Sequence, residues 1–229
     1  MTANFKRLSR AEMAAKVAND IPDGSYVNLG IGIPTLISKC LPPGRDVILH
    51  SENGILGMGP APAGGNVDLS LINASKEPVT LLAGASITDH VTSFAMMRGG
   101  HIDLTVLGAF QVSSQGDLAN WDTGAPDAIP AVGGAMDLVV GARQVFVVME
   151  HVSKTGEPKI VTECTYPLTG ARVVDRIYTD CAVIDVTASG LMVRWMCEGL
   201  TFQQLQEMTE APICAALPYS DDCVAAPPL

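Results

Sequence analysis

Residues 26–54 read YVNLGIGIPTLISKCLPPGRDVILHSENG, and this segment sets the expected fold class. Two short apolar runs, at 26–29 and 47–49, have the composition of buried strands. A helical stretch is expected between them from about Thr35, and the prolines and glycine at 42–44 end it. Strand, helix and strand in this order are typical of parallel strands joined by a crossover helix, as in α/β proteins.

Two capping boxes predict helices near the two ends of the chain. Ser9 and Glu12 have the S-x-x-E spacing, so a helix is expected from there to the turn at 22–24. Thr201 and Gln204 repeat the pattern, and that helix is expected to run to about Glu210. Apolar and β-branched runs predict the remaining elements, which are strands at 79–82, 102–110, 145–149, 159–161, 172–177, 182–186 and 191–195 and helices at 91–97 and 136–142.

The order of these elements predicts an α/β fold with a mainly parallel open sheet and helices on both faces. The strand-rich C-terminal third is expected to add some antiparallel strands. One domain is expected over residues 1–214, followed by a loosely ordered tail at 215–229, where the sequence has three prolines and no period. The glycine- and proline-rich residues 57–66 are expected to form a mobile flap, and residues 116–134 an irregular stretch.

The composition excludes several classes of partner. The chain of 229 residues carries 24 acidic and 14 basic residues, and its net charge of −10 makes nucleic acids and anionic membrane surfaces poor partners. No apolar run is long enough to cross a membrane, and no secretion signal opens the sequence, so a cytoplasmic location is expected. The six cysteines show no C-x-x-C spacing and the four histidines no H-x-x-x-H spacing, so reduced thiols and no bound metal are expected.

Common nucleotide-binding and hydrolase motifs are incomplete in this chain. Gly30 and Gly32 begin like the dinucleotide fingerprint G-x-G-x-x-G, but Thr35 stands where the third glycine is needed. Residues 84–88, GASIT, lack the last glycine of a serine-hydrolase elbow, and no G-x-x-x-x-G-K-[ST] segment occurs. The sequence therefore favours neither dinucleotide binding, nor nucleotide hydrolysis, nor serine hydrolysis.

One carboxylate stands in an unusual place. Glu52 directly follows an apolar strand and lies between Ser51 and Asn53, whose side chains can hydrogen-bond it. Open α/β sheets bind ligands at the carboxyl ends of their strands, which favours a functional site here. The alternative is that Ser-Glu-Asn-Gly is only a turn with Glu52 in solvent, and these four residues alone leave both interpretations open.

Residues 51–60, SENGILGMGP, include this turn. They resemble the active-site signature of family I coenzyme A transferases, in the chain usually called B or β. Further stretches resemble the same chain of these enzymes in the same order, at 26–34, 97–103, 116–121, 133–138 and 164–170. The similarity covers nearly residues 7–212. Within the family, residues 108–113 and 120–134 look most like the enzymes that use 3-oxoadipate, whereas acetoacetate-using relatives tend to carry a Lys-Gly-Met-Gly-Gly version that this chain lacks.

The resemblance implies roles for individual residues. It makes Glu52 the nucleophile, which forms a covalent thioester with coenzyme A. It places Asn28, Gly133 and Gly134 beside it as donors that position the substrate or stabilise an oxyanion. It assigns the surrounding segment to an active-site loop whose members are Ser51, Asn53, Gly54, Gly57 and Gly59. A glutamate is almost fully ionised at neutral pH, so it can attack a thioester without a separate base.

The resemblance also implies an activity and a partner. The expected reaction moves CoA from succinyl-CoA to 3-oxoadipate in a ping-pong mechanism, with CoA as substrate and covalent carrier and no tightly bound cofactor. Active sites of the family lie between two similar halves, and 229 residues suffice for one half. A CoA-transferase α (A) subunit is therefore expected as partner, in an A2B2 heterotetramer. Two alternatives stay open: acetoacetate or another short acid as acceptor, or a non-catalytic sugar-phosphate-binding regulator on a related scaffold.

Other polar residues are given structural interpretations. Arg98 and His101 could meet an acidic substrate, but a solvated loop or a structural ion pair is the simpler interpretation. Glu150 and His151 stand at the end of an expected buried strand, as Glu52 does. They are expected at most to line the cleft.

Overall fold

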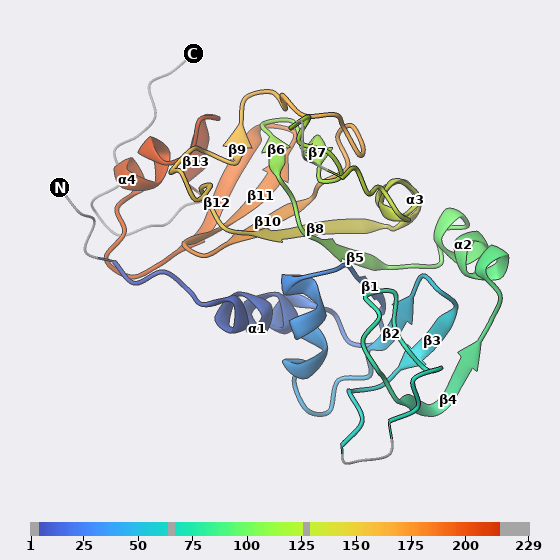
Figure 1. The fold of residues 1–229 in the computed structure, drawn as a ribbon. Coiled ribbons are helices and arrows are strands. Elements are labelled where there is room, and N and C mark those ends of the chain that lie inside the picture. The colour runs from blue at the N-terminus through green and yellow to red at the C-terminus, as the bar shows by residue number, and fades with distance from the viewer. Residues whose placement is uncertain (1–4, 64–66, 126–128, 216–229) are drawn as a thin grey trace.

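The computed structural model describes residues 5–63, 67–125 and 129–215 (Figure 1). Its helices are α1 (Arg10–Asp20), the 3-10 helix η1 (Ile33–Lys39), α2 (His90–Arg98), α3 (Ala135–Gly141) and α4 (Phe202–Glu207). The strands of the large sheet are β1 (Tyr26–Leu29), β2 (Ile48–Ser51), β3 (Ile55–Met58), β4 (Leu81–Ile87), β5 (Leu104–Leu107), β8 (Gln144–Met149), β10 (Arg176–Thr179), β11 (Ala182–Thr187), β12 (Gly190–Met196) and β13 (Ile213–Ala215). A small sheet contains β6 (Gln111–Ser113), β7 (Leu118–Ala119) and β9 (Ile160–Val161).

Within the described residues, the large sheet has the strand order β13-β12-β11-β10-β8-β5-β1-β2-β3-β4. Its middle strands, from β10 to β2, all pair in parallel. Antiparallel strands flank them, with β11 and β12 on one side and β3 and β4 on the other. The predicted mainly parallel α/β fold with antiparallel strands in the C-terminal third is confirmed. The antiparallel pair β3–β4 at the other edge is an addition that the sequence did not predict.

Apolar side chains cover both faces of the sheet. Along β8, Val145 and Val147 enter one hydrophobic cluster, and Phe146 and Val148 enter the other. Helix α1 and η1 contribute to the second cluster, whereas α2, α3 and the small sheet contribute to the first. Figure 1 shows α1 and the small sheet on opposite sides of β8. None of the helices in the described ranges is both long and apolar enough to cross a membrane.

The two capping boxes begin helices, as predicted. Ser9 Oγ accepts the Glu12 amide at 3.3 Å, and Glu12 Oε2 accepts the Ser9 amide at 2.7 Å at the start of α1. Thr201 begins α4 in the same way, but the helix ends at Glu207 and not near Glu210. The reason is that Glu210 bonds to strand β9, because its amide donates to the Ile160 carbonyl at 3.1 Å.

The prediction of a mobile flap from residue 57 is wrong for its first part. Gly57 lies within β3, which pairs with β4. Pairing continues past the strand, where the Gly59 amide donates to the Thr80 carbonyl at 2.7 Å and the Thr80 amide donates to the Pro60 carbonyl at 3.0 Å. These backbone bonds attach residues 57–60 to the sheet. Residues 64–66 lie outside the described residues.

Other predicted bounds differ as well. The strand expected at 79–82 is β4 (Leu81–Ile87), and the strand expected at 102–110 is β5 (Leu104–Leu107). The stretch 116–134 is not wholly irregular, because it contains β7. Strand β10 begins at Arg176 and not at Arg172, whose φ of +53° lies outside the β region. Ala215, the first residue of the expected tail, pairs with Val193 in β12, so the ordered domain reaches residue 215. Residues 216–229 lie outside the described part of the chain.

Candidate active site

Glu52 is the first residue after β2, in the turn that leads into β3. Strands β1 and β2 are parallel neighbours with Asn28 opposite His50, so both end at the same edge of the sheet. The turn requires glycine at 54, whose φ is +117° and where a Cβ would collide with the Thr88 carbonyl oxygen. The Thr88 amide donates to the Gly54 carbonyl at 2.8 Å. The turn is therefore anchored to the segment that enters α2.

A cavity of about 520 Å³ opens at this edge of the sheet, and Glu52 lines it together with Asn28, Gly133 and Gly134. The structure thus brings together the predicted nucleophile and all three predicted donor residues. The other lining side chains are mostly apolar and include Leu29, Ile31, Leu107, Phe110 and Leu138. The interpretation of Glu52 as the solvated tip of a plain turn does not hold, because the residue is partly buried in the wall of a cavity.

Space is tightly restricted at Gly134. A Cβ built there would lie 2.5 Å from Glu52 Oε2 and 3.2 Å from Phe94 Cζ. The preceding Gly133 has a φ of +50°, in the region that favours glycine. Position 134 therefore needs glycine because a carboxylate approaches its backbone, and not because of its own dihedral angles.

The carboxyl group of Glu52 is held between opposing influences. Burial raises its pKa, the neighbouring His90 and the backbone N–H of Gly134 lower it, and the nearby Asp137 raises it. The net direction is upward. A partly desolvated carboxylate is a stronger base and a better nucleophile than one in bulk water, so this group is suited to attack an acyl carbon.

Asn28 is almost fully buried, although it lies within an apolar strand. Its amide nitrogen is 3.1 Å from Nδ1 of His50 and 3.4 Å from the His50 carbonyl oxygen. Burial lowers the pKa of His50 to about 4, so its imidazole is neutral at pH 7. The side-chain amide of Asn28 in β1 thus has a hydrogen-bond partner on β2, and Asn28 lines the cavity.

The residues expected to form an active-site loop do not line the Glu52 cavity. Ser51 lies on the opposite face of β2 from Glu52, where its Oγ accepts the Ala74 amide at 2.9 Å. Ser51 and Gly59 line a separate cavity of about 300 Å³. Asn53 is exposed and donates to the Ile72 carbonyl at 2.7 Å. None of Ser51, Asn53, Gly54, Gly57 and Gly59 is among the described residues that line the Glu52 cavity, and they shape the turn and its strands instead.

Several residues at the cavity were not assigned a role from sequence. Asn120 lines the wall, donates to the Gly108 carbonyl at 3.1 Å and accepts from Thr169 Oγ1 at 2.6 Å. Phe94 lies close to Gly134, and Ser93 beside it is completely buried. The segment around Asn120 resembles the family, but no spacing in the sequence relates 93, 94 or 120 to Glu52.

Polar groups outside the cavity fit their structural interpretations. Arg98 forms an ion pair with Asp137 at 2.6 Å, with most of the arginine side chain in solvent, so the structural interpretation of Arg98 is confirmed. His101 is exposed. In the described part of the chain, no three side chains of His, Cys, Asp or Glu converge as metal ligands.

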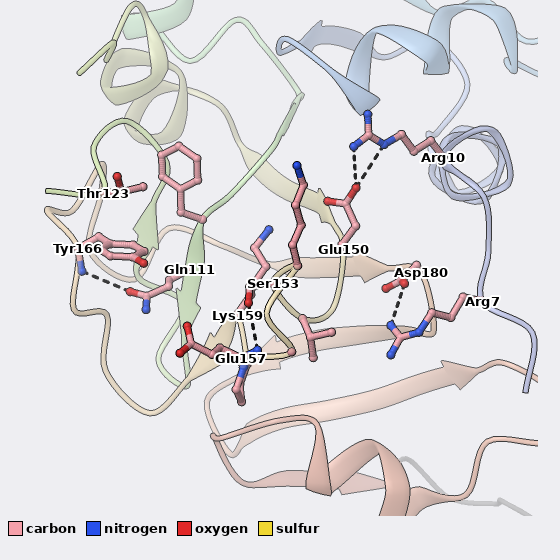
Figure 2. Close-up of a pocket in the computed structure, with 15 residues that line it drawn as sticks. Arg7, Arg10, Gln111, Thr123, Glu150, Ser153, Glu157, Lys159, Tyr166 and Asp180 are labelled. Atoms are coloured by element: carbon pink, nitrogen blue, oxygen red, sulfur yellow. Dashed lines mark hydrogen bonds and ion pairs between the residues drawn. The ribbon is translucent and has the colours of Figure 1, made fainter. Parts of the chain in front are cut away.

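A larger cavity, of about 670 Å³, lies farther along the same edge (Figure 2). Two ion pairs lie in its wall, between Arg7 and Asp180 at 2.8 Å and between Arg10 and Glu150 at 2.9 Å. Glu150 therefore does line a cleft at a strand end, although not the one that holds Glu52. Phe110 belongs to the walls of both cavities, so the two hollows are neighbours.

The sequence of this chain is similar to those of known coenzyme A transferases. The family model described as coenzyme A transferase matches residues 10–208. The chain is 60% identical to the B subunit of 3-oxoadipate CoA-transferase from Acinetobacter baylyi, across 93% of this chain and 98% of that protein. It is 49% identical to the B subunit of the probable succinyl-CoA:3-ketoacid coenzyme A transferase of Bacillus subtilis, across 89% and 94% of the two chains.

A solved structure shares the fold. The acyl-CoA transferase YdiF from Escherichia coli O157:H7 superimposes with a TM-score of 0.70 at 19% identity. The match covers 95% of this chain and 43% of that one, so the chain spans less than half the length of YdiF. At this identity, the likeness concerns the fold alone.

Proposed function

The chain belongs to the coenzyme A transferase family, and from this we propose that it is the β (B) subunit of an enzyme that moves CoA from succinyl-CoA to 3-oxoadipate. One observation carries the proposal: the Glu52 carboxylate lies in a largely apolar cavity against the Gly134 backbone and beside Asn28. Membership of an enzyme family favours catalysis over the alternative of a sugar-phosphate-binding regulator.

The proposed chemistry uses Glu52 as a covalent relay. A Glu52 oxygen attacks the thioester carbonyl of succinyl-CoA, and the C–S bond breaks to give an acyl-glutamyl anhydride and CoA thiolate. The thiolate attacks the Glu52 carbonyl, which releases succinate and leaves a glutamyl-CoA thioester. The carboxylate of 3-oxoadipate then repeats these two steps in reverse, which yields 3-oxoadipyl-CoA and regenerates Glu52. No net proton is transferred.

The walls of the cavity suit the intermediates. Each attack produces a tetrahedral oxyanion, and preorganised N–H groups stabilise such charge best where water is excluded. We assign the amides of Gly133 and Gly134 and the side-chain amide of Asn28 to this role. The apolar wall limits the water that would hydrolyse the anhydride.

The relatives are named as B subunits, which implies a partner of the A type, and the site itself is incomplete without one. Succinyl-CoA and 3-oxoadipate each keep a free carboxylate away from the reacting carbonyl, and CoA carries phosphates. No described residue that lines the Glu52 cavity is Lys, Arg or His. Ile31, on its rim, leaves 73% of its surface exposed. We infer that the A subunit supplies the missing cations and covers the rim, in an A2B2 heterotetramer.

Steady-state exchange assays test this proposal. The chain is assayed alone and after co-expression with its A-type partner, with 3-oxoadipate and acetoacetate as competing acceptors. The complex should transfer CoA to 3-oxoadipate with the higher kcat/KM, and the chain alone should be inactive. Glu52→Gln in the complex should lower kcat by about 1,000-fold or more, because it removes the nucleophile. Preference for acetoacetate would reassign the acceptor, and activity of Glu52→Gln would overturn the mechanism.

A further inference from the structure

A continuous chain of hydrogen bonds runs from Asn28 to the main chain of Glu52. Asn28 Nδ2 lies 3.1 Å from His50 Nδ1, and His50 Nε2 lies 3.0 Å from Ser93 Oγ. Ser93 Oγ donates to the Glu52 carbonyl oxygen at 2.8 Å. The three side chains are at most 2% exposed and come from β1, β2 and α2. This series of hydrogen bonds therefore connects β1, β2 and α2, and it ends on the backbone of Glu52, the proposed nucleophile.

The direction of every bond in this chain is determined. A carbonyl oxygen only accepts, so the single proton of the Ser93 hydroxyl is committed to Glu52. Ser93 Oγ must then accept from His50, which places the imidazole proton on Nε2. A neutral imidazole carries one N–H, so Nδ1 accepts from the Asn28 amide. The lowered pKa of His50 agrees with this neutral tautomer.

The same assignment fixes the orientation of Asn28. Its Nδ2 must face His50, because a neutral Nδ1 without a proton would repel the amide oxygen. One N–H is committed to Nδ1 at 3.1 Å. The second makes only a long contact of 3.4 Å with the His50 carbonyl, so this donor is the one left for a substrate oxygen.

We propose that His50 is a positioning residue that, as the Nε2–H tautomer, sets both the backbone of Glu52 through Ser93 and the amide of Asn28. The inference rests on the proposed role of Glu52. A displacement of about 1 Å at a reacting group costs about 100-fold in rate, so loss of either bond should slow the covalent step. Binding of CoA esters should change little, because none of the three bonds is needed to hold the ester.

Two substitutions at position 50 separate the two bonds. In His50→Gln the side-chain amide N–H can replace Nε2–H toward Ser93, whereas in His50→Asn the shorter side chain can accept from Asn28 but does not reach Ser93. The variants are compared in the heteromeric complex, by single-turnover formation of the glutamyl thioester from succinyl-CoA. His50→Asn and Ser93→Ala should slow this step about 10- to 100-fold with KM within about threefold, and His50→Gln should recover about tenfold of the loss.

A double variant and a control complete the test. If His50 acts through Ser93, the double variant His50→Asn/Ser93→Ala should be no slower than the slower single variant. Thr105→Val is the control, since Thr105 is buried opposite Asn28 on β5 and its Oγ1 has no hydrogen-bond partner among the described residues. It should keep the rate within about twofold.

Three results would overturn the inference. They are a wild-type rate in His50→Asn, equal rates in His50→Asn and His50→Gln, and a double variant whose loss is the product of the two single losses. Because the two position-50 variants are compared with each other, the test stands even if Ser93→Ala does not fold. An inactive Glu52→Gln alongside any of these results would leave the proposed function intact and remove only the role of His50.

Discussion

At residue 134, the absence of a side chain is the property that the site needs. Glu52 Oε2 and Phe94 Cζ occupy the space that a methyl group would fill. The lack of a Cβ lets the Glu52 carboxylate lie close to the Gly134 backbone. In the proposed mechanism this glycine serves the chemistry, whereas Gly54 serves the geometry of the turn.

Gly134→Ala should therefore lower kcat by about 100-fold or more, since the new methyl group pushes the Glu52 carboxylate out of position. Steady-state assay of the complex measures the loss. Gly108→Ala is the matched variant, because it also adds a methyl group to this cavity but meets no atom within 4 Å at an ordinary φ. It should cost far less. Equal losses in the two variants would mean that any added bulk, and not the contact with Glu52, is responsible.

Sequence reasoning noticed Glu52 because it is a carboxylate at the end of an apolar strand, and the family resemblance placed Asn28 beside it; a polar residue within an apolar strand needs a hydrogen-bond partner, which agrees with that placement. His50 carried the same signal and was not singled out, although the period of a strand places it on the same face as Glu52. Ser93 carried no such signal. Its position beside His50 and the Glu52 carbonyl depends on where α2 lies in the fold, which no local pattern specifies.

Among the elements, helix α1 shows how local sequence and packing cooperate. Ser9 and Glu12 close the capping box, and Met13, Ala14, Val17 and Ala18 bury one face of the helix. This periodicity and this cap were readable from sequence. The cap satisfies backbone N–H groups that would otherwise have only water as partner.

Ser9→Ala should lower the free energy of unfolding by about 1 kcal/mol, the usual cost of losing an N-cap. For a domain of this size the melting temperature should fall by about 2–4 °C. Urea denaturation of the chain measures the change, and Ser9→Thr should restore most of it because threonine keeps the capping oxygen. A free energy of unfolding unchanged by Ser9→Ala would show that α1 depends on its packing alone.

Strand β4 was harder to predict than α1. Its sequence, LLAGASI, does not alternate between apolar and polar residues, and most of its side chains are exposed. Gly84 inside it has a φ of +84°, which departs from strand geometry. The strand exists because β3 offers it backbone partners at Leu81, Ser86 and Ile87. Strand pairing of this kind overrides local propensity, which also explains why residues 57–60 are held to the sheet.

For the whole molecule, burial of neutral histidines makes stability depend on pH. Burial lowers the pKa of both His50 and His151 to about 4, and both rings are fully engaged, His151 with Thr179 and Thr209. In the unfolded chain a histidine takes up a proton near pH 6.5. As the pH falls from about 6.5 to about 4, the unfolded state binds more protons than the folded state and stability is lost.

Each histidine can contribute up to about 3 kcal/mol to this loss, at about 1.4 kcal/mol for each pKa unit. Glu52 and Asp175 act in the opposite direction, since burial raises their pKa values. Urea unfolding of the chain at about pH 7 and about pH 5 measures the net effect. His151→Gln should be less stable at pH 7 but should lose less on acidification than the wild type. Equal losses on acidification would mean that His151 does not take part.

The class of the whole fold was predictable, and the order of its strands was not. Alternating strands and helices predict a parallel sheet, but nothing local places β1 between β5 and β2. That placement brings Asn28 next to His50 and brings Glu52 within reach of Gly134 across 82 positions of sequence. The cavity is therefore a property of the topology, whereas the proposed nucleophile is a property of one short motif.

Mass spectrometry of the complex after incubation with succinyl-CoA alone, followed by borohydride, tests the covalent role of Glu52 most directly. Borohydride reduces a glutamyl thioester to the alcohol and leaves a free carboxylate unchanged. The peptide that contains Glu52 should carry the reduced side chain, and the modification should disappear when 3-oxoadipate is added before the borohydride. An unmodified Glu52 peptide from a complex that exchanges CoA at its full rate would contradict the account.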